Sequence, residues 1–166
     1  MFWLLTIFFL FLSLGISVLS GNHGLWLPAV PLCAFSFAMR GGALRTGFLA
    51  LPAAALLDAL WMRHFPGQCL ATIALLILAH VMRKWGDTDS WCTLVAAVVM
   101  GTLIERVAEG IFILTGQGGR WDFLGRGGWY LLLFSVVYLL ALSWIQDRLL
   151  ARRLFSAQEE EDARGK

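Results

Sequence analysis

The chain has 166 residues, of which 59% are hydrophobic and only 14% are charged, and its formal net charge is +2. Soluble domains carry about 25% charged residues, and a soluble domain of this length cannot bury so much apolar surface. The composition therefore excludes an ordinary soluble domain and indicates a multi-pass inner or plasma membrane protein that forms one compact bundle. The basic residues lie in short loops and a tail rather than in one patch, which argues against nucleic acid as a partner.

Six apolar runs follow one another along the chain, several of them near the 17 to 25 residues or so that a helix needs to cross a bilayer. The first run lacks a basic start and is longer than the core of a signal peptide, so it is expected to be a retained helix. The connections are short, which makes consecutive helices antiparallel neighbours. The sequence thus predicts an all-α membrane protein, a compact bundle of six transmembrane helices at residues 2–20, 25–39, 43–62, 67–82, 92–115 and 127–147.

The distribution of Lys and Arg predicts the orientation of the bundle, because these residues concentrate on the cytoplasmic side. With the N-terminus inside, only Arg63, Arg120 and Arg126 fall in outer segments. Both termini are therefore expected in the cytoplasm. The basic residues of the inner segments are Arg40, Arg45, Arg83, Lys84, Arg148, Arg152, Arg153, Arg164 and Lys166.

The chain divides into a six-helix transmembrane domain at residues 1–147 and a cytoplasmic segment at residues 148–166, which is a basic stub followed by an acidic tail. Apolar residues recur near helical spacing in the stub, with arginines between them. Two interpretations are open. The stub lies on the inner membrane surface and attracts anionic headgroups, or it is a basic flank that precedes a disordered tail.

Ionisable residues within spans are costly, about 2.5 to 3.5 kcal/mol at a helix centre, and are therefore functional candidates. Asp58 lies in the third span, and Glu105, Arg106 and Glu109 form an intramembrane charge cluster in the fifth. In the expected topology Asp58 and Arg106 differ by roughly 7 Å in depth, which predicts an ion pair between these two spans. A proton relay is the alternative, but no chain of histidines and carboxylates continues the path.

Small residues form a stripe along one face of the third span. Gly47, Ala50, Ala54 and Asp58 follow one another at steps of three, four and four residues. Small residues let a second helix approach closely, and packing is what drives helix association in lipid. The stripe predicts a contact with a partner helix, from this chain or from another protein.

Sequence patterns typical of catalysis are absent. The histidines and the three cysteines do not have metal-ligand spacing, and no Ser, His and acid arrangement is present. The glycine-rich segments at residues 116–120 and 125–128 flank no predicted strand, which argues against dinucleotide binding. We therefore expect a protein that is not an enzyme and that binds no metal or cofactor.

Residues 25–84 contain a short second span that starts with proline, a basic turn, a third span with a small residue and an Asp, a glycine, and a fourth span that ends in basic residues. In this pattern they resemble the core of the MreD family of rod shape-determining membrane proteins. Pro52 and the alanines near it depart from the family pattern, and the charge cluster of the fifth span cannot be assigned to the family. The matching positions are Pro28 or Pro31, Arg40, Arg45, Gly47, Asp58, Gly67, Arg83 and Lys84.

The resemblance implies a non-enzymatic scaffold of the bacterial cell-elongation complex in the inner membrane, with Asp58 and Gly67 among its partner or helix-packing residues. It implies binding to an MreC-like bitopic protein and, through it, to the MreB filament, a SEDS glycosyltransferase and a class B penicillin-binding protein. It also implies a fold similar to the S components of energy-coupling-factor transporters. A small-solute-binding S component of a vitamin transporter is therefore the alternative, with the charge cluster of the fifth span lining its site.

Overall fold

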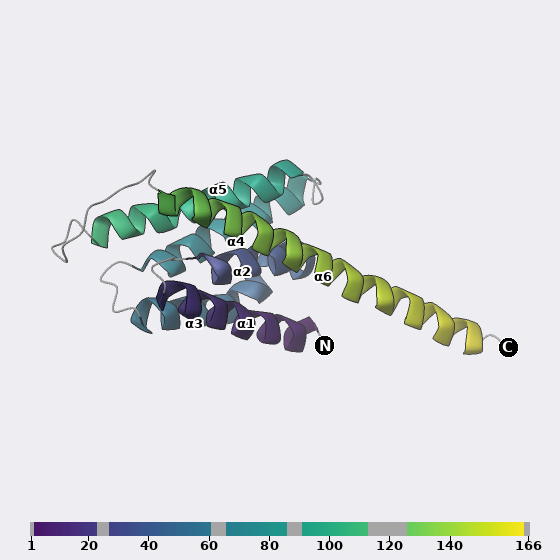
Figure 1. Ribbon diagram of the computed structural model, residues 1–166. Coiled ribbons are helices and arrows are strands. Elements are labelled where there is room, and N and C mark those ends of the chain that lie inside the picture. The colour runs from purple at the N-terminus through teal and green to yellow at the C-terminus, as the bar shows by residue number, and fades with distance from the viewer. Residues whose placement is uncertain (1, 23–26, 61–65, 86–90, 113–125, 165–166) are drawn as a thin grey trace.

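The computed structural model describes residues 2–22, 27–60, 66–85, 91–112 and 126–164, and within these ranges the secondary structure is entirely helical (Figure 1). The helices follow the predicted order, and most of their ends lie within a few residues of the predicted ones. The exception is the last helix, which continues far beyond residue 147. The helices are α1 (Phe2–Asn22), α2 (Ala29–Gly41), α3 (Ala43–Leu60), α4 (Gly67–Trp85), α5 (Trp91–Phe112) and α6 (Arg126–Arg164).

Four helices in the described part of the chain, α1, α3, α4 and α6, are long and apolar enough to cross a membrane. Their outer faces carry exposed apolar side chains, such as Phe11 on α1, which is 74% exposed, and Phe48 on α3, which is 79% exposed. Exposed apolar surface on this scale is unfavourable in water and is matched by lipid tails. The interpretation of the chain as a membrane protein with transmembrane helices agrees with these features. Helices α2 and α5 contain shorter apolar stretches, Ala29–Gly41 and Thr93–Ile104.

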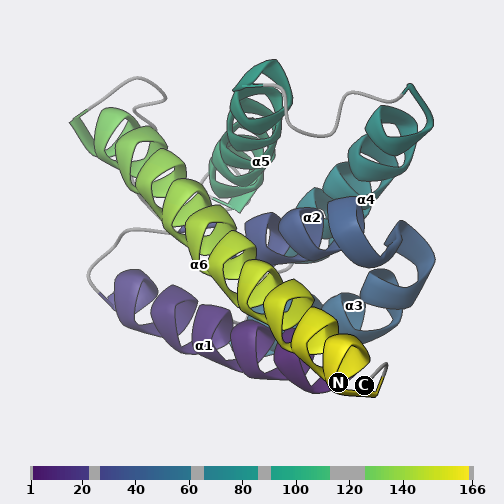
Figure 2. The same ribbon diagram turned by 90° about the vertical axis from the view of Figure 1, so that its right-hand side faces the viewer.

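Helix α2 is the centre of the bundle. It is the shortest helix, yet it packs against α1, α3, α4, α5 and α6, and every residue from Ala29 to Ala38 is buried. A helix that is apolar on all sides is stable only when other protein or lipid surrounds it. The other five helices provide that environment, and Figure 2 shows them arranged around α2.

The turns at the two ends of α2 follow from its sequence. Pro28 precedes the helix, and its carbonyl accepts a hydrogen bond from the Leu32 N–H at 3.0 Å. Proline has no N–H, but at the start of a helix the N–H groups have no partner within the helix, so none is lost. At the other end Gly42 has φ +103°, a conformation that favours glycine. Its N–H donates to the Ala38 carbonyl at 3.0 Å, and α3 begins at the next residue.

Helix α6 extends well past the rest of the bundle (Figure 1). It has 39 residues and is therefore roughly 58 Å long at 1.5 Å per residue, whereas its apolar stretch covers only Trp129–Arg148. The backbone of residues 148–164 continues the same helix without a break. The basic and acidic residues that follow the apolar stretch therefore lie on a helical extension of the bundle.

Candidate functional site

The carboxylate of Asp58 caps the first turn of α4. Asp58 lies near the end of α3 and is only 6% exposed. One of its oxygens accepts a hydrogen bond from the Gln68 N–H at 3.1 Å, and the other accepts one from the Cys69 N–H at 3.0 Å. Both carboxylate oxygens thus bind the backbone of the next helix.

The start of α4 explains why an acid is needed there. The first N–H groups of a helix have no partner within the helix, and Pro66, whose carbonyl accepts the Leu70 N–H at 3.0 Å, has no side chain that could bind them. A buried N–H without an acceptor is costly, above all in a membrane. A negative charge at this position also interacts favourably with the helix dipole. Asp58 therefore takes the role of an N-cap residue from a neighbouring helix and fixes the connection between α3 and α4.

The small-residue stripe of α3 faces inward. Gly47, Ala50 and Ala54 are buried, and a Cβ atom added to Gly47 would lie 3.1 Å from Cδ1 of Leu76 on α4. Gly67 is also buried, at the first position of α4. At Gly47 the helix that approaches the stripe is therefore α4 of the same chain, and Asp58 caps that same helix at the end of the stripe.

The structure does not bring Asp58 and Arg106 together. Over the described ranges, no Cα atom of α3 lies within 8 Å of one in α5, and both oxygens of Asp58 already bind α4. Arg106 is half-buried on α5, which packs against α2, α4 and α6. The expected ion pair is wrong because matching depth along the membrane normal says nothing about lateral position.

For Glu105 and Glu109, the other two residues of the predicted charge cluster, the structure describes only the backbone. Glu105 and Glu109 lie on α5, one turn apart around Arg106. Their side chains lie outside the part of the chain that the structure describes.

A polar cluster that the sequence did not predict joins the C-terminal half of α2 to the middle of α6. The Gln146 carbonyl oxygen accepts hydrogen bonds from the Ser36 hydroxyl at 2.7 Å and from the Arg40 guanidinium. Arg40 also donates to Ser143 at 3.3 Å and forms an ion pair with Asp147 at 2.7 Å. Gln146 is only 2% exposed, so a single buried amide ties the central helix to α6.

This cluster predicts unequal effects of two neighbouring substitutions. Gln146→Ala leaves the Ser36 hydroxyl and one guanidinium N–H of Arg40 without an acceptor, and we expect a loss of about 1 to 3 kcal/mol in the free energy of unfolding. Asp147→Asn should cost less than about 1 kcal/mol, because the side chain of Asp147 is 66% exposed and exposed ion pairs contribute little. Thermal unfolding in detergent compares the two variants. Equal losses would contradict the central role of the amide.

Other uncharged polar groups lie between the helices. The hydroxyl groups of Ser13 on α1 and Tyr138 on α6 are 2.5 Å apart, and Ser17 donates to the Leu27 carbonyl at 3.3 Å. Because these hydroxyl groups are uncharged, they were not among the ionisable residues that the sequence predicted as functional. The signal was present in the sequence, since Ser, Thr and Gln within apolar runs are the residues that form hydrogen bonds between membrane helices.

Comparison with family models, curated proteins and solved structures gives no match to this chain. The resemblance to the MreD family therefore stays a prediction from the residues themselves. Among the described residues, no group of three His, Cys, Asp or Glu side chains has the geometry of a metal site. The arrangement at Asp58 supports helix packing and capping, and nothing in its hydrogen bonding requires a ligand.

Proposed function

We propose that this protein is a non-enzymatic scaffold of the bacterial cell-elongation complex. In this proposal its six helices all cross the inner membrane, both termini are cytoplasmic, and the bundle binds an MreC-like bitopic protein. Through that partner it organises lateral peptidoglycan synthesis with the MreB filament, a SEDS glycosyltransferase and a class B penicillin-binding protein.

One observation carries the proposal. Four of the positions that carry the MreD resemblance, Gly47, Asp58, Gly67 and Arg83, lie at the contacts between α2, α3 and α4. Gly47 packs on Leu76, Asp58 caps the helix that begins at Gly67, and Arg83 lies beside Gly42 at the turn between α2 and α3. The contacts among these four positions support the resemblance, because a family pattern favours residues that together build one unit of the fold.

The partner would bind an outward face of the bundle. The Gly47 face of α3 is unsuitable, because α4 already covers it. The outer faces of the helices offer exposed apolar side chains, and in lipid a single-span helix binds such a face through close packing and hydrogen bonds. Asp58 then contributes indirectly, since it holds α3 and α4 in the arrangement that the partner would meet.

Affinity purification of the tagged protein from gently solubilised membranes tests the proposal. We expect a single-span MreC-like protein and cell-wall synthesis enzymes to be recovered with it, and the Asp147→Asn variant, which should leave the fold intact, to recover the same set. Recovery of transporter ATPase subunits in their place would overturn the scaffold and favour the S component of a vitamin transporter.

A further inference from the structure

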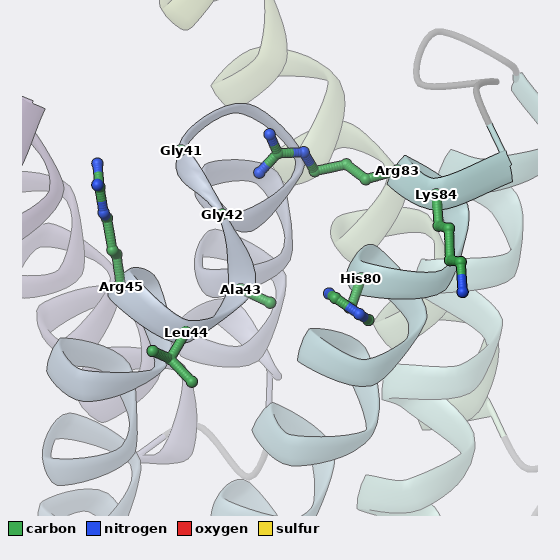
Figure 3. Close-up of a pocket in the computed structure, with 8 residues that line it drawn as sticks. All are labelled: Gly41, Gly42, Ala43, Leu44, Arg45, His80, Arg83 and Lys84. Atoms are coloured by element: carbon green, nitrogen blue, oxygen red, sulfur yellow. The ribbon is translucent and has the colours of Figure 1, made fainter.

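An open pocket lies at the end of the bundle where α2 turns into α3 and where α4 ends. Its volume is about 460 Å³. Figure 3 shows the side chain of Arg83 reaching over the turn at Gly41 and Gly42, and His80 facing the start of α3, with Arg45 and Lys84 at the two sides. The lining residues are Gly41, Gly42, Ala43, Leu44, Arg45, His80, Arg83 and Lys84.

The positive charge of this pocket has no counter-charge in the described part of the chain. Arg45, Arg83 and Lys84 make no ion pair or hydrogen bond with a described residue, and no acidic residue lines the pocket. Arg40, at the same end of the bundle, is by contrast neutralised by Asp147. Like charges around one pocket disfavour one another unless an anion compensates them, so the described lining of this pocket favours an anion.

One helix start and two helix ends meet at the pocket. The Gly42 carbonyl accepts the Thr46 N–H at 3.2 Å and so begins α3, whose positive end lies beside the negative ends of α2 and α4. A Cβ atom at Gly42 would lie 3.2 Å from Nη1 of Arg83. The missing side chain therefore lets the guanidinium approach the turn, where an anion would meet both the cation and the backbone N–H groups.

The pocket lies at the level of lipid headgroups. Ala43 is the first residue of one membrane-spanning stretch and Lys84 is the last residue of another, so both mark the same membrane surface. Apolar side chains continue from it into the membrane, since Leu44 is 92% exposed, Phe48 one turn further along α3 is 79% exposed, and Ile77 one turn before His80 is 60% exposed. A cationic rim above exposed apolar side chains is complementary to a molecule with an anionic head and a hydrocarbon tail.

We propose that this pocket binds the phosphate group of an anionic phospholipid. The phosphate lies between Arg83 and the N-terminus of α3, Arg45 and Lys84 add positive charge at the two sides of the pocket, and an acyl chain follows Leu44 and Phe48. Neither the scaffold function nor a transport function requires this site, so its test is independent of theirs. Free phosphate has the same charged group as the lipid headgroup, but it has no hydrocarbon tail to contact the exposed apolar side chains.

Native mass spectrometry of the full-length protein, exchanged from nanodiscs of phosphatidylcholine with a minority of phosphatidylglycerol, tests the proposal. We expect phosphatidylglycerol to be retained in preference to phosphatidylcholine. Each of Arg45→Gln, Arg83→Gln and Lys84→Gln should reduce that preference about fivefold, the effect of losing one basic residue near an anionic headgroup. Arg148→Gln is the matched control for general surface charge, because it removes an exposed cation that is outside the pocket, and it should reduce the preference less than any of the three pocket variants.

Three results would overturn the proposal. The first is equal retention of both lipids by the wild-type protein, a result that does not depend on the folding of any variant. The second is complete displacement of phosphatidylglycerol by inorganic phosphate alone at millimolar concentration, which would assign the pocket to free phosphate. The double variant Asp87→Asn and Asp89→Asn, which removes two acids from the segment after α4 that lies outside the described residues, should keep or raise retention, and a fall would contradict direct binding by the cations.

Discussion

Replacing Asp58 by alanine is expected to lower the free energy of unfolding by about 2 to 4 kcal/mol, because two buried N–H groups lose their acceptor at once. The Gln68 and Cys69 N–H groups bind the two oxygens of this carboxylate, and in a membrane water cannot replace it. The loss should appear as a lower midpoint of thermal unfolding in detergent, followed by size-exclusion chromatography with fluorescence detection.

A series of substitutions at Asp58 separates capping from a direct role in partner binding. Asparagine retains one acceptor oxygen but loses the charge that favours the start of α4, so Asp58→Asn should be intermediate between the wild type and Asp58→Ala. Asp147→Asn, which removes an exposed carboxylate, is the control and should change stability little. If Asp58→Ala unfolds at the wild-type temperature but fails to recover the partner, the carboxylate acts in docking and the capping interpretation is wrong.

Hydrophobicity and periodicity were sufficient to predict the number and order of the helices, because each apolar run needs only its own residues to form one. The same reasoning could identify Gly47, Ala50 and Ala54 as one face, since helical spacing is a local property. It also predicted that another helix would approach that face. Which helix packs against that face depends on the lateral arrangement of the bundle, and helical spacing does not determine that arrangement.

The functional partner of Asp58 could not be predicted for a related reason. Opposite charge and similar depth favoured Arg106, but the actual donors are backbone N–H groups, which are the same in every residue and leave no trace in the sequence. The one local indication was Pro66, a residue without a capping side chain just before a helix. The hydrogen bond between Arg40 and Gln146 was also not predicted, because an amide in an apolar run carries no charge and was not counted among the ionisable residues.

The second large effect on the free energy of unfolding is expected where α3 and α4 approach each other closely. A Cβ atom at Gly47 would lie 3.1 Å from Cδ1 of Leu76, a terminal methyl group that can shift by a few tenths of an ångström. Gly47→Ala should therefore change the free energy of unfolding by less than about 1 kcal/mol, since the strain is offset by the better helix propensity of alanine. Gly47→Val adds branches that a small shift cannot accommodate, and we expect a loss of about 1 to 3 kcal/mol.

Two further variants show whether the cost arises at this contact. A Cβ atom at Gly15 on α1 would have no neighbour within 4 Å, so Gly15→Ala should be neutral or stabilising and serves as the matched control for Gly47→Ala. Leu76→Ala opens space opposite Gly47 and is destabilising alone, but combined with Gly47→Val it should cost less than the sum of the two single changes. Strict additivity in this double-mutant cycle, measured by thermal unfolding, would show that α3 does not press on Leu76 and would contradict the close approach of α3 and α4 at Gly47.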